Sequence, residues 1–76
     1  MIDILVSRNK QTGDVVVHQI FDSKDYSDLD LLVDTQVKLS QMVDNSFPSD
    51  VYDTQIISGR SLEEIYNAYP LFAPKE

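Results

Sequence analysis

Two short β-branched segments on either side of a turn constrain the fold of this chain most. Residues 2–8 alternate between apolar and polar side chains over part of their length, and residues 15–21 are rich in valine, isoleucine and phenylalanine. Both patterns are typical of β-strands. Residues 9–14 between them collect turn formers, and Gly13 can adopt the positive φ that a tight turn needs. We therefore predict that the chain begins with a β-hairpin.

The second predicted strand carries apolar side chains on both faces. One face of a small antiparallel sheet normally stays in contact with water. We therefore expect this strand either to be central and covered on both sides, or to offer an apolar patch to a partner. Strict alternation divides its side chains into two sets, with Val15, Val17 and Phe21 on one side and Val16, His18 and Ile20 on the other.

A long amphipathic helix is predicted next. Ser27 followed by Asp30 approximates a capping box, so we expect the helix to begin near Ser27 and to end near Asp44. Asp34 and Lys38 fall on its polar side and form a favourable i,i+4 pair. The side expected to pack on the sheet is an apolar stripe at helical spacing: Leu29, Leu32, Val33, Val37, Leu39 and Val43.

A third strand and a short helix complete the predicted elements. Residues 51–57 are again β-branched and aromatic, and Ser61 with Glu64 forms a capping box for a helix that Pro70 stops. Residues 70–76 are expected to be a tail. The order is therefore ββαβα, and we predict an α+β fold in which a three-stranded sheet packs against the long helix on one face.

The length and composition limit the chain to one domain over residues 1–76. It has no cysteine, so its fold relies on an apolar core, and this fits the reducing cytoplasm. The start of the chain lacks the basic and apolar regions of a signal peptide. No apolar run approaches the roughly 20 residues that span a bilayer, so we expect no contact with a membrane.

The chain carries thirteen acidic side chains against six basic ones, a net charge of -7. Such a charge repels nucleic acid and anionic lipid and favours a basic protein partner. The expected docking surface is the acidic segment, which comprises Asp22, Asp25, Asp28, Asp30 and Asp34.

The acidic segment is too weak to imitate a whole DNA duplex. The long helix should run on the order of 25 Å. Duplex DNA of that length presents about 15 phosphates. The five aspartates are in addition partly neutralised by Lys24 and Lys38. We therefore expect docking against one basic patch, with no direct binding of nucleic acid by the chain itself.

No catalytic, metal or cofactor motif is recognisable. A calcium loop needs a glycine and a bidentate glutamate, and the acidic segment has neither. His18 is the only histidine, too few for a typical zinc site, and no nucleophile elbow accompanies it. Residues 58–61 (Ser-Gly-Arg-Ser) precede a helix and could hold an anion, but they lack the Walker spacing. We predict a protein that is not an enzyme, and leave anion binding at this turn open.

Two apolar sets are candidates for contact with a partner or a second copy. The first set is the second face of the hairpin: Leu5, Val16, His18 and Ile20. The second set is an aromatic cluster that either closes the core or binds a partner: Tyr66, Tyr69 and Phe72.

These observations favour a small acidic cytoplasmic protein that binds another protein. An inhibitor or accessory factor, of the kind that phages and mobile elements often encode, has this size and character. The alternative is a structural, self-assembling protein, such as a homodimer whose interface is the second face of the sheet.

Overall fold

The computed structural model describes residues 1–73, and within them the predicted order of elements and the α+β class are confirmed. Two short 3₁₀ helices, η1 and η2, follow β2 and α2 respectively. The bounds are β1 (Ile2–Asn9), β2 (Val15–Asp22), η1 (Ser23–Asp25), α1 (Leu29–Ser46), β3 (Tyr52–Gly59), α2 (Leu62–Ala68) and η2 (Pro70–Phe72).

The N-terminal strand β1 lies at the centre of the sheet. The strand order is β2-β1-β3, and β1 is antiparallel to both neighbours. Ile4, Leu5 and Val6 are buried, as a strand covered on both faces requires. Of the two alternatives expected for the second strand, the central position is therefore excluded: β2 is an edge strand. The segment that contains α1 connects β2 to β3 across β1, so β3 pairs with the edge of β1 that is opposite β2.

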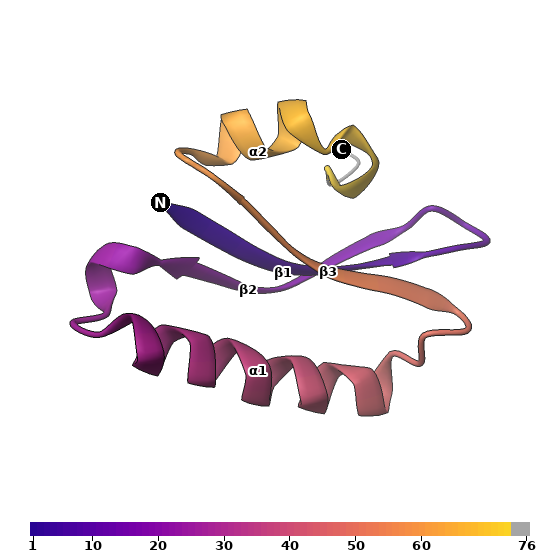
Figure 1. Cartoon of the computed structure of the whole chain (residues 1–76). Helices are drawn as coiled ribbons and strands as arrows, with labels where there is room; N and C mark the ends of the chain where they lie inside the picture. The colour runs from indigo at the N-terminus through magenta and orange to yellow at the C-terminus, as the bar shows by residue number, and fades with distance from the viewer. Residues whose placement is uncertain (74–76) are drawn as a thin grey trace.

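Helices cover both faces of the sheet. α1 runs along one face, as predicted, whereas α2 and η2 cover the opposite face (Figure 1). Each face has its own apolar cluster. Beneath α1 the buried members are Leu5, Phe21, Leu32 and Val43, and beneath α2 they are Ile4, Val6, Ile57, Ile65 and Phe72.

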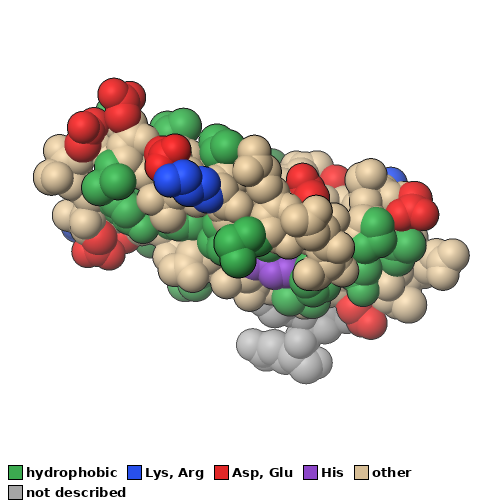
Figure 2. All heavy atoms as spheres, turned by 90° about the horizontal axis from the view of Figure 1, so that it is seen from below, with side chains coloured by type: hydrophobic (Ala, Val, Ile, Leu, Met, Phe, Trp, Pro, Cys, Tyr) green, Lys and Arg blue, Asp and Glu red, His purple; other side chains and the backbone are tan. Residues whose placement is uncertain are grey.

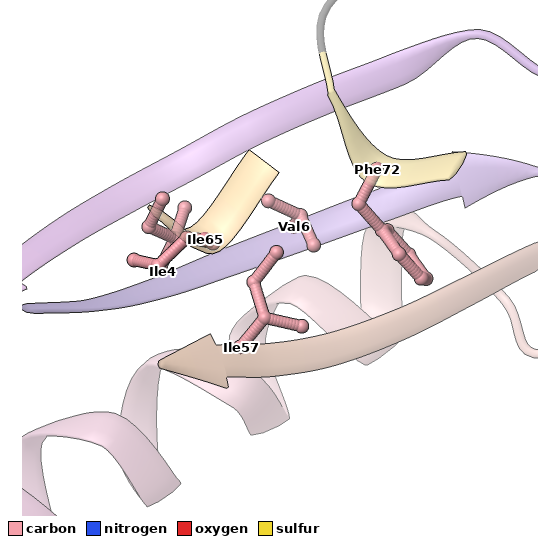
Figure 3. Packing of buried hydrophobic residues seen from close by; sticks show 5 residues of the cluster. All are labelled: Ile4, Val6, Ile57, Ile65 and Phe72. Carbon is pink, nitrogen blue, oxygen red and sulfur yellow. The ribbon is translucent and has the colours of Figure 1, made fainter. Parts of the chain in front are cut away.

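The cluster beneath α2 includes part of the predicted tail. Phe72 from η2 and Ile65 from α2 both reach the strands, as Figure 3 shows. Gly59 allows this approach, since a Cβ there would lie 2.7 Å from Cγ1 of Ile65. The tail therefore begins with a structured turn, and positions 74–76 lie outside the described residues.

A β-bulge in β2 changes which side chains share a face. Leu5 pairs with Gln19 and Val6 pairs with Val17, so His18 is an extra residue without a partner in β1. Val17 consequently packs on the α2 side, although Phe21 packs beneath α1. The two sets of side chains assigned to β2 by strict alternation are therefore wrong. One inserted residue moves every side chain that follows it in the strand to the opposite face of the sheet.

The face of α1 that meets the sheet is more polar than the predicted stripe. Leu32 and Val43 are buried as expected, but Leu29, Val33 and Val37 are exposed. The half-buried positions instead include Thr35, Gln36 and Ser40. The prediction that the apolar stripe packs on the sheet is therefore wrong for Leu29, Val33 and Val37, three of its six residues.

Compared with the prediction, α1 is rotated about its own axis, and a carboxylate on β1 accounts for this rotation. Gln36 Nε2 donates to Asp3 Oδ2 at 2.8 Å, and Ser58 Oγ donates to Asp3 Oδ1 at 2.6 Å. A half-buried carboxylate needs such partners, and Gln36 can supply one only if its side of α1 faces the sheet.

The starts of the two helices are set by different caps. Asp28, one residue later than predicted, is the N-cap of α1, and its carboxylate accepts from the Asp30 amide at 2.9 Å. Ser61 is the N-cap of α2 as predicted, accepting from the Glu64 amide at 3.1 Å. Asp is at least as good an N-cap as Ser, so the neighbouring aspartate takes the position.

Candidate protein-binding groove

The acidic segment lies around η1 and the first half of α1. Acidic side chains lie toward both ends of the α1 face, with exposed apolar ones between them (Figure 2). Two aspartates have local structural roles: Asp22 accepts from the Lys24 amide at 3.0 Å and caps η1, and Asp28 caps α1. Asp25 and Asp30 are exposed in the first turns of these helices, where the dipole favours them.

An apolar groove of about 490 Å³ lies beside the acidic segment, between α1 and β2. We call it the α1–β2 groove. Most of its lining is apolar. Of its polar members, Asp34, Lys38 and Gln19 are exposed, and Thr35 is half-buried. The apolar lining comprises Phe21, Tyr26, Leu31, Leu39 and Met42.

The base of the groove is buried, and its sides are exposed. Phe21 is buried, and its ring lies 6.4 Å from that of Tyr26 at a tilt of 50°. Leu31 and Met42 are exposed on α1, so their side chains contribute apolar surface that the chain itself does not cover. The groove therefore offers an aromatic base with apolar sides.

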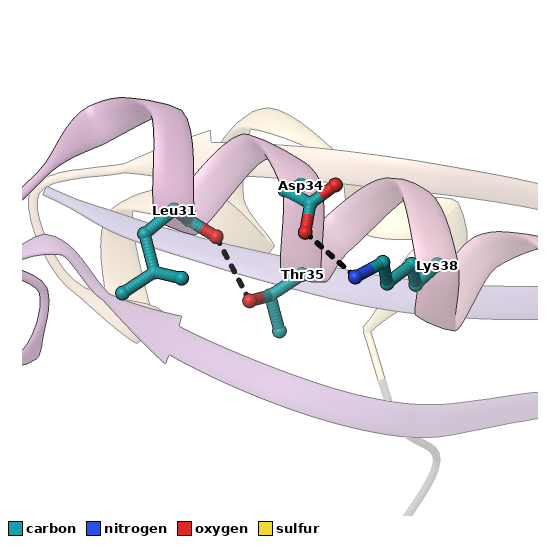
Figure 4. A network of polar contacts seen from close by, with 4 residues as sticks. All are labelled: Leu31, Asp34, Thr35 and Lys38. Atoms are coloured by element: carbon teal, nitrogen blue, oxygen red, sulfur yellow. Dashed lines mark hydrogen bonds and ion pairs between the residues drawn. The ribbon is translucent and has the colours of Figure 1, made fainter.

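An ion pair marks the rim of the groove. Lys38 Nζ lies 2.9 Å from Asp34 Oδ2, and the Thr35 hydroxyl donates to the Leu31 carbonyl at 2.8 Å (Figure 4). Both charged side chains are more than half exposed, and such pairs contribute little to stability. Asp34 can therefore exchange its partner, and it belongs to both the acidic segment and the groove.

The structure does not bring the four residues of the predicted hairpin surface together. Leu5 is buried beneath α1, so it is not available to a partner. Val16 pairs with Ser7 and shares the α1 face with it, whereas Ile20 pairs with Ile4 on the α2 face. The bulge separates them, and no single surface contains the set.

The predicted aromatic cluster is mainly part of the core. Phe72 is buried and Tyr66 packs, half-buried, against the same cluster beneath α2. Tyr69 remains partly exposed as the C-cap of α2. Two of the three aromatic residues thus complete the core beneath α2, which is one of the two alternatives predicted for the cluster.

His18 belongs to a polar network beneath α1 that sequence reasoning missed. His18 Nε2 and Ser7 Oγ share a hydrogen bond of 2.8 Å, and Ser7 Oγ shares another of 2.7 Å with Thr54 Oγ1. The imidazole and the Phe47 ring are nearly perpendicular, with their centres 4.6 Å apart. Burial lowers the pKa of His18 below its usual 6.5. Ser7 is fully buried, so this serine–histidine contact is closed to a substrate.

The turn at residues 58–61 uses most of its polar groups within the fold. Ser58 donates to Asp3, and Ser61 accepts from the Glu64 amide. Gly59 is pressed against α2, and Arg60 is exposed. The serine hydroxyls that an anion would require are thus already engaged.

Residues 1–73 contain no group of three or more His, Asp or Glu side chains placed to hold a metal ion. Within the same span, none of the helices combines the length and the apolar character that crossing a bilayer demands. The chain matches no family model, no curated protein and no solved structure.

Proposed function

We propose that this chain is a small, cytoplasmic, non-enzymatic protein that binds a basic protein through the α1–β2 groove and the acidic segment. The observation that carries the proposal is that the two surfaces meet on α1. Leu31 and Asp34 both line the groove, and Asp34 is also the last aspartate of the acidic segment.

The chemistry of the combined surface defines the partner. An apolar side chain can enter the groove between Leu31, Met42 and the Phe21 base. Lysine or arginine side chains beside that anchor can pair with Asp34 and Asp30. An amphipathic basic helix carries both kinds of side chain at the required spacing, and helix-in-groove docking is a recurrent mode of recognition.

The net charge of -7 supports fast and selective association. A field of one sign steers a basic partner to the surface, and salt weakens this effect because the screening length is about 8 Å at physiological ionic strength. The apolar anchor would supply the part of the affinity that salt does not remove.

Covering the basic surface of a nucleic-acid-binding protein would block its access to nucleic acid. An inhibitor or accessory factor of phage or mobile-element type acts in this way, and the size of the chain suits it. The exposed Asp25 and Asp30 are free of capping roles, so they can serve such a contact without loss of the fold.

Affinity capture from a lysate of the source organism, followed by titration of the purified partner, tests the proposal. We expect a basic protein to be retained at moderate salt. Leu31→Ser should weaken its binding about tenfold or more, because burial of a leucine side chain contributes about 1.5–3 kcal/mol.

Val33→Ser is the matched control. Val33 is 54% exposed and Leu31 is 52% exposed on the same helix, but only Leu31 lines the groove. Equal affinity of the two variants, or retention of no basic protein, would contradict the proposal.

Self-assembly into a homo-oligomer is a second candidate function. It is supported by a different feature, the uncovered β3 edge of the sheet, and no residue of β3 lines the groove.

A further inference from the structure

The outer edge of β3 presents backbone groups that no other strand of residues 1–73 pairs with. β3 is eight residues long and pairs with β1 without a register shift. Natural edge strands are usually protected by lysine, proline, a bulge or a short length. β3 has neither lysine nor proline, and its ladder is regular. It is therefore competent to accept a further strand.

The direction of the backbone groups follows from the ladder with β1. The Lys10 amide donates to the Val51 carbonyl at 2.9 Å, so Val51 points its carbonyl toward β1. Hydrogen-bonded positions alternate along an antiparallel pair. The outer edge accordingly carries the free carbonyls of Tyr52, Thr54, Ile56 and Ser58. The free amides are those of Thr54, Ile56 and Ser58, since the Tyr52 amide donates to the Pro48 carbonyl at 2.9 Å.

A second copy of the chain fits this edge in an antiparallel register centred on Ile56. An outward-pointing residue must pair with another outward-pointing residue, so Ile56 faces Ile56 and Thr54 faces Ser58 of the second copy. Ile56 is partly exposed and would be covered in this arrangement. Such a pairing continues the three strands of each copy into one six-stranded sheet.

The charges agree with this register. Asp53 lies opposite Gly59 of the second copy, so the two Asp53 carboxylates are kept apart. Arg60, just beyond the strand, comes opposite Tyr52 of the second copy, where a guanidinium can stack on an aromatic ring. No like charges face each other, in spite of the acidic character of the whole chain.

The edge of β2 is less suited to self-pairing. Its ladder is interrupted by the bulge at His18, and a bulge twists an edge away from further pairing. Antiparallel pairing of two β2 strands over their full length would also bring Asp22 of one copy toward Asp14 of the other. Repulsion between these carboxylates opposes the pairing.

We infer that this chain forms a homodimer by antiparallel pairing of two β3 strands about a two-fold axis at Ile56. A strand edge alone buries less than the roughly 800 Å² per partner of a typical stable interface. The dimer is therefore reversible and depends on protein concentration. It rests on self-assembly, the second candidate function, and specifies its interface. It leaves the α1–β2 groove open, so the dimer and the binding of a basic partner can fail independently of each other.

Sedimentation equilibrium from micromolar to millimolar protein tests the inference. We expect a shift from monomer to dimer, and Ile56→Lys should abolish it by placing two like charges on the axis. Ile20→Lys is the matched control, since Ile20 is 45% exposed on the β2 edge and Ile56 is 39% exposed on the β3 edge. A wild-type protein that stays monomeric, or an Ile56→Lys variant that dimerises like Ile20→Lys, would overturn the inference.

The absence of cysteine makes the register directly measurable. In the inferred register two copies of an Ile56→Cys variant bring their Cα atoms to about 5.5 Å, a separation that a disulfide spans. We expect this variant to form a covalent dimer under mild oxidation much faster than Ile20→Cys. Equal rates for the two variants would exclude a two-fold axis at Ile56, and circular dichroism of each variant would verify that it is folded.

Discussion

At the residue scale, the most informative side chain is His18, the extra residue of the β2 bulge. The bulge turns His18 toward Ser7 and Phe47 beneath α1, where a neutral imidazole can satisfy the buried serine hydroxyl. No buried side-chain nitrogen or oxygen in the described residues lacks a hydrogen-bond partner. One inserted residue thus sets both the facing of β2 and the environment of the only histidine.

We predict that the free energy of unfolding falls as the pH drops below about 6.5, the ordinary pKa of histidine. Burial lowers the pKa of His18 in the folded protein, so the unfolded chain binds the proton more readily. The stabilisation is therefore complete above that value and is lost on acidification. Chemical unfolding at several pH values measures it.

His18→Gln is the control for this pH dependence, since the amide keeps a hydrogen-bonding group beside Ser7 and does not titrate. Its stability should vary little between pH 7 and the range near pH 5 where carboxylates begin to titrate. An equal decline in the variant would show that another group is responsible.

At the element scale, aspartates close together in sequence have different structural tasks. Asp28 holds the first turn of α1 with its carboxylate, whereas Asp25 is exposed and is not a cap. Sequence reasoning located both helix starts to within one residue, because capping depends on neighbours along the chain. The capping-box pattern favours Ser27, but the carboxylate of Asp28 alone caps α1.

We predict that Asp28→Ala lowers the free energy of unfolding by about 1 kcal/mol, the usual cost of removing an N-cap. Asp25→Ala should change it by less than about 0.5 kcal/mol, as is typical of exposed positions. Both changes remove one negative charge, so the comparison isolates the cap. Denaturant titration monitored by circular dichroism measures the difference, and equal effects of the two changes would refute the assigned role of Asp28.

At the scale of the whole molecule, stability depends on covering both faces of a three-stranded sheet. Phe72 follows the last regular helix, yet it completes the cluster beneath α2. A chain of this length buries only about 60% of its unfolded surface. Each large buried side chain therefore contributes a large share of the total stability.

We predict that Phe72→Ala costs about 3–5 kcal/mol, the range for removal of a buried phenylalanine. That is a large fraction of the roughly 5–15 kcal/mol of a typical domain, so the variant should be partly or fully unfolded at room temperature. Leu71→Ala is the control, because Leu71 is 65% exposed beside it. Thermal unfolding compares the two, and a small effect of Phe72→Ala would show that η2 does not stabilise the sheet.

The class of the fold and the order of its elements follow from the sequence alone. Strand alternation, helical spacing and capping at Ser61 are local, so neighbouring residues suffice to predict them. The acidic segment of the proposed binding surface can also be identified from the sequence alone, because its aspartates lie close together along the chain. The strand order was not, because pairing depends on contacts between distant segments.

Only the tertiary structure decided which side chains face outward. The bulge at His18 reversed the facing of β2, and the contact of Gln36 with Asp3 set the rotation of α1. That rotation leaves Leu29, Val33 and Val37 exposed. Leu31 and Met42 lie exposed beside β2, where they supply apolar sides of the groove. Periodicity identifies an apolar stripe, but polar contacts with another strand determine which side of the helix packs on the sheet.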